Sequence, residues 1–313
     1  MIINTGARTD MAQWYSDWLL ERFREGVVLV RNPFYPDTVI RYQLDPAVVD
    51  CVVFCSKNYA PILPRLHEIT ERFNTYFFYT ITAYGRDIEP RVPDIEASVE
   101  TLYALEEQVG KKRIAWRYDP VLLTDAYTAQ RHKETFSFLC SKLAGHVDCC
   151  IFSFVERYQK LRHNMPELIP FTRESEEEMA KSLGEIARSY GIRLECCVAK
   201  SDWSAYGIAQ SGCITLEKLG HANNVRFRSL KHAGMRPGCR CIVSHDIGAY
   251  DSCPNGCHYC YANQTPELAE ERWRRRPGPE SPLILGELKD SDRVIDGAQK
   301  SFLVDDGRQL SLF

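Results

Sequence analysis

The sequence predicts an α/β protein built on a (β/α) barrel. Along residues 1–263, short apolar segments rich in β-branched and aromatic residues alternate with amphipathic segments of helical period. About seven strand–helix units follow one another, and a single helix between successive strands requires a parallel sheet. Right-handed crossovers can close such a sheet into a barrel, complete or incomplete. An open parallel sheet is the alternative.

One hairpin interrupts this alternation near the start of the chain. The first strand, 1–4, leads into a helix that begins near Met11 and ends near Gly26. Two short strands, 27–30 and 38–42, then form the hairpin. The other predicted strands are 51–55, 76–82, 114–118, 149–154, 193–198 and 240–244.

Two local signals define the later boundaries. A capping box formed by Ser175 and Glu178 is predicted to start the last long helix, and Gly191 to follow its end. Residues 264–313 are polar and rich in Pro and Gly, so we expect a C-terminal extension after the domain of residues 1–263.

Composition indicates a cytoplasmic protein. The net charge is −3, no apolar run approaches the length of a membrane span, and the N-terminus lacks a signal pattern. Thiols stay reduced in the cytoplasm, so 13 cysteines indicate metal rather than disulfides. Eight of the 13 lie between Cys196 and Cys260, which places the metal chemistry in the C-terminal third.

Two basic runs lie on either side of the main cysteine segment. Between Lys218 and Arg240 there are basic residues but no acidic residue, and Arg272-Trp-Arg-Arg-Arg276 follows later. Such runs are usually solvated faces of a protein. Together they also suit a polyanionic substrate such as nucleic acid.

Three cysteines share the short segment Cys253-Pro-Asn-Gly-Cys257-His-Tyr-Cys260. The C-x3-C-x2-C spacing can place three thiolates on a [4Fe–4S] cluster and leave the fourth iron without a protein ligand. An open metal position is where substrate chemistry can take place. Pro254 and Gly256 permit the sharp turn of such a loop. A zinc site or a chance grouping is the alternative, but zinc normally takes four protein ligands.

Four further cysteines can form a second site. They are Cys197, Cys213, Cys239 and Cys241, and four thiolates can ligate every iron of an auxiliary [4Fe–4S] cluster. A structural zinc site and unligated buried thiols are the alternatives. Cys196 can replace Cys197, because neighbouring strand residues point to opposite faces.

Polar side chains are predicted at the carboxyl ends of the strands, where barrels of this kind have their active sites. The candidates are Thr5, Arg8, Asp10, Cys55, Tyr84, Arg117 and Asp119. We expect the cysteine loop at the same end of the strands, which is the mouth of the predicted barrel. Tyr84, Arg117 and Asp119 are therefore candidate catalytic residues. Cys55, at the end of its strand, is a candidate hydrogen-atom donor.

Several blocks resemble the bacterial family catalogued as domain of unknown function 1848. They are Arg8-Thr-Asp10, Arg31-Asn-Pro33, Trp116-Arg-Tyr-Asp-Pro120 and the whole of residues 239–263. The resemblance runs nearly end to end. The family is regarded as radical-SAM-like, and the cysteine loop resembles the signature of the radical SAM superfamily. The sequence of residues 257–262 also resembles a segment of spore photoproduct lyase, which repairs a thymine dimer in DNA.

The superfamily resemblance implies S-adenosylmethionine as cofactor, with its amino and carboxylate groups on the open iron. In that superfamily the aromatic residue before the last cysteine, here Tyr259, lies near the adenine. The loop usually follows the first strand, so its late position here implies a circular permutation that puts strand 1–4 beside the cluster strand. Thr5, Arg8 and Asp10 would then contact the methionine part of the cofactor.

The tail Gln309-Leu-Ser-Leu-Phe313 resembles the peptide by which bacterial polymerases and repair proteins dock on the sliding clamp. Aliphatic and aromatic anchors carry most of the energy of such small interfaces. The alternative is a tail that packs on its own barrel.

These features predict a radical SAM enzyme that forms a 5′-deoxyadenosyl radical and acts on DNA or another nucleic acid, for repair or base modification. It would take its electron from a reductase, flavodoxin or ferredoxin. One alternative is a radical SAM enzyme with a small metabolite or peptide as substrate. The other is a non-catalytic iron–sulfur protein for electron transfer or redox sensing.

Overall fold

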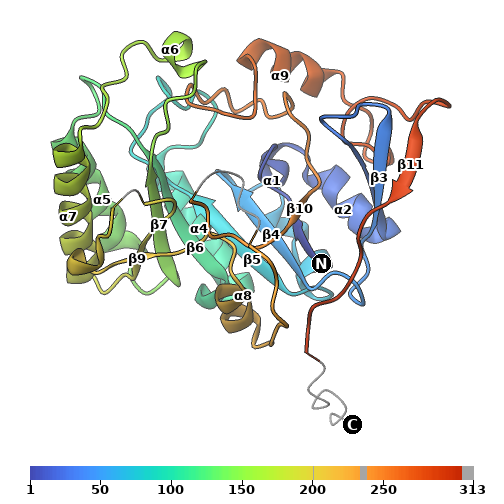
Figure 1. The fold of residues 1–313 in the computed structure, drawn as a ribbon, viewed down its shortest axis with the longest axis horizontal. Helices are drawn as coiled ribbons and strands as arrows, with labels where there is room; N and C mark the ends of the chain where they lie inside the picture. The colour runs from blue at the N-terminus through green and yellow to red at the C-terminus, as the bar shows by residue number, and fades with distance from the viewer. Residues whose placement is uncertain (200, 233–237, 305–313) are drawn as a thin grey trace.

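An eight-stranded parallel sheet forms the centre of the computed structural model, which describes residues 1–199, 201–232 and 238–304 (Figure 1). The strands lie in the order β10-β1-β4-β5-β6-β7-β8-β9, and every neighbouring pair is parallel. This confirms the predicted α/β class. The strands are β1 Ile2–Asn4, β4 Cys51–Ser56, β5 Thr75–Thr80, β6 Ile114–Val121, β7 Cys149–Phe154, β8 Leu194–Cys196, β9 Ile208–Gln210 and β10 His245–Asp246.

The sheet is open in the part of the chain that the structure describes. Its edge strands are β10 and β9, and no pairing between them closes a barrel there. β8 and β9 have three residues each and β10 has two, so the last strands offer few backbone groups for further pairing. β1 lies next to β10, as predicted from the late position of the cysteine loop. In this pairing Ile3 lies opposite His245.

Both faces of the sheet are buried. All six residues of β5 are buried, as expected in the middle of a parallel sheet. Alternate residues of β4 enter two separate apolar cores, with Val52 and Phe54 in one and Cys51 and Val53 in the other. The sheet therefore has a helix layer or loop layer on each side.

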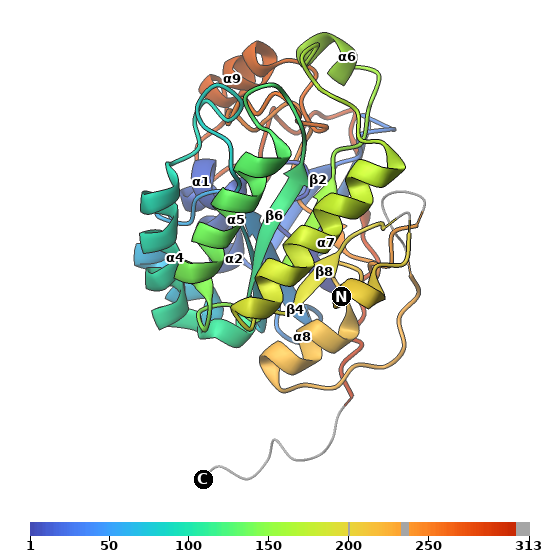
Figure 2. The same ribbon diagram turned by 90° about the vertical axis from the view of Figure 1, so that its left-hand side faces the viewer.

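The larger core lies under the long helices. α4, α5 and α7 stand side by side over this face (Figure 2), and α8 packs Leu219 and Ala222 into the smaller core on the other. The helices are α1 Met11–Trp14, α2 Ser16–Glu25, α3 His67–Thr70, α4 Ile95–Val109, α5 Ala129–Leu143, α6 Leu161–Asn164, α7 Arg173–Ser189, α8 Leu216–Asn223 and α9 Pro266–Arg274.

The first predicted helix is two helices. α1 ends at Tyr15, whose backbone leaves the helical region, and α2 then runs to the left-handed Gly26. Asp10 caps α1 by accepting a hydrogen bond from the backbone N–H of Gln13. This cap places Asp10 at the junction of the β1 loop and the helix.

The predicted start of α7 was wrong by one turn. The capping box joins Thr172 and Ser175, and the helix begins at Arg173 rather than after Ser175. Thr172 has the extended backbone that an N-cap requires, so its hydroxyl accepts from the N–H of Ser175. Gly191 lies just beyond the end of the helix in a left-handed conformation, as predicted.

A second, three-stranded sheet contains the predicted hairpin. β2 (Val27–Arg31) and β3 (Thr38–Gln43) are antiparallel, and β11 (Arg293–Asp296) adds a parallel strand beside β3. The C-terminal extension therefore packs on the first part of the chain. Its α9 also places Trp273 edge-to-face on Trp14, with ring centroids 5.2 Å apart.

The region between β8 and the cysteine loop differs most from the prediction. β9 and α8 were not predicted. The strand predicted at 240–244 is wrong, because these residues contain only an isolated bridge at Ile242, and the strand β10 follows at His245–Asp246. Of the helices that the structure describes, none is long and apolar enough to cross a membrane.

His132 is a buried histidine that is held neutral. Its Nε2 lies 2.7 Å from the carbonyl oxygen of Leu122 and its Nδ1 lies 2.8 Å from the hydroxyl of Tyr118. A neutral ring protonated on Nε2 satisfies both contacts, since the tyrosine hydroxyl can then donate to Nδ1. Burial is the main cause that lowers the pKa of His132 to about 4 from 6.5.

We expect this histidine to make folding stability depend on pH. Between pH 6.5 and 4 the unfolded chain binds a proton that the folded chain excludes, so the free energy of unfolding falls by about 3 kcal/mol as the pH falls through this window. Urea unfolding at several pH values measures this loss. His132→Gln keeps one donor and one acceptor but cannot titrate, so a slope as steep as in the unmodified protein would contradict the assignment.

Candidate metal centre

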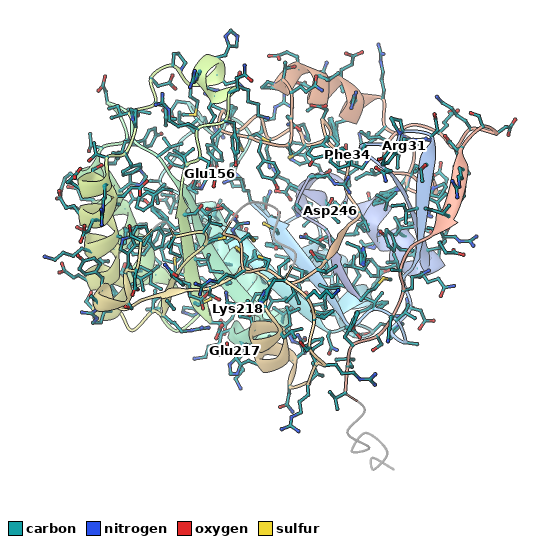
Figure 3. All side chains as sticks on the ribbon, in the orientation of Figure 1. Arg31, Phe34, Glu156, Glu217, Lys218 and Asp246 are labelled. Carbon is teal, nitrogen blue, oxygen red and sulfur yellow. The ribbon has the colours of Figure 1, made fainter. Side chains whose placement is uncertain are left out.

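The cysteine loop leaves the sheet beside the end of β1. The backbone N–H of Ile247 donates to the carbonyl oxygen of Asn4 (3.1 Å), which extends the β10–β1 pairing toward the loop. Asp246 (Figure 3) accepts from Arg8 Nε at 2.6 Å and from the N–H of Ala7 at 2.9 Å. The loop that follows β1 and the segment that leads to Cys253 are thus fixed to each other.

Asn255 ties the loop to three other segments. Its side-chain oxygen accepts from Trp14 Nε1 (2.9 Å), its side-chain nitrogen donates to Asp10 (3.3 Å), and its carbonyl accepts from the N–H of Arg91 (3.3 Å). Asn255 is buried, so each of these bonds is shielded from water. Gly256 follows with a positive φ of 73°, which its lack of a Cβ permits.

The three thiols of this loop are half-buried and interact electrostatically. Cys257 interacts with both Cys253 and Cys260, and Cys253 also interacts with Cys260. Burial raises the pKa of Cys253 to about 12 and holds the pKa of Cys257 well above its usual range. The N–H of Ala262 points at the sulfur of Cys260 (3.3 Å). Cys253 and Cys257 are thus protonated when no metal is bound and would lose their protons to a bound metal.

A buried ion pair supports the aromatic residue of the loop. Glu89, 2% exposed, accepts from Lys57 Nζ and from the hydroxyl of Thr82, both at 2.9 Å. The hydroxyl of Tyr259 also donates to Glu89, and Lys57 Nζ lies 5.6 Å from the centre of the Tyr259 ring. Lys57 interacts electrostatically with Cys257, so a cation lies beside the thiols.

The three residues predicted to contact the methionine part of the cofactor are occupied by protein contacts. Thr5 is buried and donates to the carbonyl of Val53, and Arg8 is paired with Asp246. Asp10 accepts hydrogen bonds from the side chains of Ser56 and Asn255 and from the backbone N–H groups of Lys57 and Gln13. These side chains therefore connect the segment after β1 to neighbouring segments at the ends of the strands.

Tyr84, a predicted catalytic residue, has its hydroxyl engaged by the backbone. Its hydroxyl donates to the carbonyl oxygen of Pro120 (2.7 Å) and accepts from the N–H of Leu122 (2.9 Å). The side chain is buried, and its ring lies 5.8 Å from the ring of Tyr259. Because both hydrogen-bonding roles of the hydroxyl are filled by the backbone, Tyr84 shapes the wall behind Tyr259.

Cys55, Arg117 and Asp119 form one polar group at the ends of β4 and β6. Arg117 donates to the sulfur of Cys55 (3.2 Å) and is paired with Asp119, which also accepts from the hydroxyl of Ser153. Arg117 interacts electrostatically with Cys213 and Cys197 as well. These three predicted catalytic residues therefore lie together, beside the second set of cysteines.

The second set of cysteines comes together from three segments. The thiol of Cys197 is hydrogen-bonded to Cys213 and Cys239, and the thiol of Cys241 is hydrogen-bonded to the same two residues. These bonds hold the pKa of Cys213 well below its usual range and raise those of Cys197 and Cys241. The four sulfurs thus form a closed ring of contacts, which we call the four-thiol group.

Comparison with known proteins identifies the family. The model of domain of unknown function 1848 (DUF1848) matches residues 2–262. The chain belongs to this family. The resemblance noted in the sequence blocks is thereby confirmed.

Other comparisons add little to this result. No curated protein matches the chain. A solved structure described as a candidate alpha-L-fucosidase from Bacteroides thetaiotaomicron is 13% identical over 69% of this chain and 61% of that chain, with a TM-score of 0.28. At this TM-score the likeness carries no information on fold or function.

The thiols of this DUF1848 protein suit iron–sulfur ligation in number and chemistry. None of the 13 cysteines forms a disulfide, and all of them lie in the part of the chain that the structure describes. Among the described residues, no three His, Cys, Asp or Glu side chains are arranged to hold a single metal ion. A [4Fe–4S] cluster is larger than one ion and takes each ligand sulfur on a different iron. Three neighbouring thiols on one loop, with N–H groups directed at two of the sulfurs, fit a cluster with one open iron.

An open pocket of about 580 Å³ lies beside the cysteine loop. Tyr158, Gln159, Lys160 and Tyr261 line it. Tyr261 donates to the carbonyl oxygen of Ala7, and Lys160 Nζ donates to the carbonyl oxygen of Asn263 (2.6 Å). The segment between β7 and α7 thus faces the loop across a space of ligand size.

Part of the basic sequence is neutralised. Lys218 on α8 (Figure 3) is 4% exposed and forms an ion pair with Glu195 (2.5 Å), so it is not a surface cation. In the second run, Arg274 pairs with Glu270 and Arg275 with Glu271. The basic surface is therefore smaller than the sequence indicates.

Sequence reasoning missed Glu89 and Asn255. Glu89 lies in an irregular segment after β5, where no periodic pattern assigns a burial. Asn255 lies inside the cysteine loop, where it was read only as part of the spacing. An acidic residue 32 positions after Lys57 carries no sequence signal of pairing, because the β4–β5 crossover brings the two together.

Proposed function

We propose that this protein is a radical SAM enzyme whose catalytic cluster is held by Cys253, Cys257 and Cys260. The observation that carries the proposal is the meeting of these three thiols on one tethered loop at the carboxyl ends of β10 and β1. Three thiolates leave one iron open. A reducing compartment such as the cytoplasm suits a chain whose 13 cysteines, all described, form no disulfide.

The cofactor supplies the difficult chemistry. Held by Cys253, Cys257 and Cys260, a reduced [4Fe–4S] cluster would supply the one electron needed to cleave the C5′–S bond of S-adenosylmethionine into methionine and a 5′-deoxyadenosyl radical, and this radical would take a hydrogen atom from the substrate. A reductase, flavodoxin or ferredoxin would supply the electron. The chain itself positions the reactants and excludes water.

The chain's own residues have distinct tasks in this proposal. Asn255 and Asp10 fix the loop, while Glu89 and Lys57 fix the hydroxyl and ring of Tyr259. The ring of Tyr259 can then pack against the adenine. The pocket lined by Lys160 and Tyr261 is the proposed opening for substrate.

The permuted order is part of the proposal. β1 pairs with β10, so the first strand of the chain lies directly beside the strand that delivers the loop. The pairing of β1 with β10 supports an incomplete (β/α) barrel whose strand order is circularly permuted relative to the superfamily. The loop after β1 then borders the loop that would hold the cofactor.

The test is anaerobic reconstitution with iron and sulfide. We expect a reduced cluster whose electron paramagnetic resonance spectrum changes when S-adenosylmethionine is added, and release of 5′-deoxyadenosine under dithionite. A reduced cluster that leaves S-adenosylmethionine intact would contradict the enzyme proposal and favour an electron-transfer protein.

For the substrate we propose nucleic acid, supported by the clamp-like tail and by the two basic runs in the sequence on either side of the main cysteine segment. The tail, Gln309–Phe313, lies outside the described residues. Nucleic-acid binding should weaken steeply as salt is raised, whereas a small metabolite or peptide substrate predicts no such slope.

Removal of residues 309–313 is expected to abolish binding to a bacterial sliding clamp, because Leu310, Leu312 and Phe313 supply the apolar anchors of the docking peptide. We expect binding of about micromolar affinity for the full chain, as is usual for short docking peptides. Calorimetric titration with a clamp measures it. A Gln309→Ala, Phe313→Ala variant should lose binding in the same way, and equal binding by all forms would contradict the docking role.

A further inference from the structure

The four-thiol group is built by backbone contacts that do not depend on the cysteine side chains. A Cβ on Gly212 would lie 2.5 Å from the carbonyl oxygen of Arg240 and 2.7 Å from the nitrogen of Cys241. The N–H of Ile242 donates to the carbonyl of Ile214 at 3.0 Å. The segments that carry Cys213 and Cys241 are therefore pressed together, and only glycine permits this approach.

The third segment enters from the end of β8. The backbone N–H of Cys197 donates to the carbonyl of Phe152 (2.9 Å), which continues the β8–β7 pairing by one residue. Strand alternation then sends Cys196 and Cys197 to opposite sides. Cys196 packs in the larger core, whereas Cys197 packs with Cys213 and Cys241 in the smaller one.

We propose that Cys197, Cys213, Cys239 and Cys241 hold a second [4Fe–4S] cluster, in which every iron has a protein ligand. The proposal goes beyond the radical SAM assignment and rests on different residues. Four thiolates on four irons leave no open position. This centre would therefore store or pass one electron rather than bind substrate.

The four-thiol group has polar partners beside its sulfurs. Arg117 interacts electrostatically with Cys197 and Cys213, and Lys218 interacts with Cys213. Both cations are also paired with carboxylates, Arg117 with Asp119 and Lys218 with Glu195. The N–H of Ile214 donates to the sulfur of Cys241 (3.5 Å), and such N–H···S contacts stabilise ligating thiolates.

Ligand spacing favours a cluster over zinc. Structural zinc sites normally use cysteine pairs separated by two to four residues. Here Cys239 and Cys241 are separated by one residue, and Cys197 and Cys213 by fifteen.

The two sets of cysteines share one mouth. Cys55 interacts electrostatically with Cys213, while Tyr261 interacts with both Cys55 and Cys260. Cys55 also accepts the hydrogen bond of Arg117. A short series of side chains thus connects the four-thiol group to the loop of the proposed catalytic cluster.

The test counts iron and sulfide in the anaerobically reconstituted full chain. We expect about eight irons and eight sulfides per chain, falling to about four in Cys197→Ala and in Cys239→Ala. Cys196→Ala is the matched control and should keep all of them. Circular dichroism and thermal melting establish that each variant is folded.

A triple Cys253, Cys257, Cys260→Ala variant separates this proposal from the proposed function. It should retain about four irons and a [4Fe–4S] spectrum even though it cannot cleave S-adenosylmethionine. Loss of all iron in this variant would overturn the second cluster. So would full iron in folded Cys197→Ala, or one zinc per chain that Cys197→Ala loses and the triple variant keeps.

Discussion

Replacing Cys257 by alanine is expected to abolish S-adenosylmethionine cleavage while the fold persists. Cys257 is the middle ligand of the proposed catalytic cluster and interacts with both of its neighbours, Cys253 and Cys260. Two remaining thiolates cannot hold three irons of a cluster. The loop itself should stay in place, because its tethers run through Asn255 rather than through the cysteine sulfur.

Product analysis by chromatography measures the effect. We expect 5′-deoxyadenosine to fall below detection in Cys257→Ala, with an unchanged circular dichroism spectrum. Cys140→Ala is the matched control, since Cys140 is a buried cysteine on α5 that packs among apolar side chains. S-adenosylmethionine cleavage that persists in Cys257→Ala would contradict the assignment of this loop to the catalytic cluster.

Local patterns predicted the parts of the fold that depend on neighbouring residues. Apolar strands between amphipathic helices gave a parallel α/β sheet, and the position of β1 beside β10 followed from the late cysteine loop. Closure into a barrel depends on strand length and tilt over the whole sheet. No local sequence period contains that information, so the sequence left both a barrel and an open sheet possible, and the structure has open edges at β9 and β10 in the part of the chain that it describes.

The candidate site was predicted by position better than by role. The sequence placed Asp10, Tyr84 and Arg117 at the mouth, and the structure brings them there. Their hydrogen-bond partners come from other segments, which the sequence does not reveal. The catalytic role of Tyr84 stays a prediction for this reason, and the partners of its hydroxyl at the end of β6 are ones that no sequence pattern indicated.

Removing the carboxylate of Glu89 is expected to destabilise the protein by about 3–5 kcal/mol, because it leaves the amine of Lys57 largely buried without its partner. The Lys57 side chain is 13% exposed and that of Glu89 2% exposed, so little water can replace the lost contact. Three donors lose their acceptor together: Lys57, Thr82 and Tyr259. Urea unfolding of Glu89→Ala against the unmodified chain measures the loss.

Two comparisons separate charge burial from a general cost of truncation. Glu68→Ala removes a carboxylate that is 30% exposed and paired with Arg24 and Arg65, so it should cost less than about 1 kcal/mol. A Lys57→Met, Glu89→Leu double variant removes both charges and should recover much of the stability lost in Glu89→Ala, because no unpaired charge is left inside.

Recovery of stability without recovery of S-adenosylmethionine cleavage would mean that this ion pair serves Tyr259 and the proposed cofactor site rather than the fold. If the double variant is instead as unstable as Glu89→Ala, the loss comes from the hydrogen bonds of Thr82 and Tyr259 and not from the buried amine.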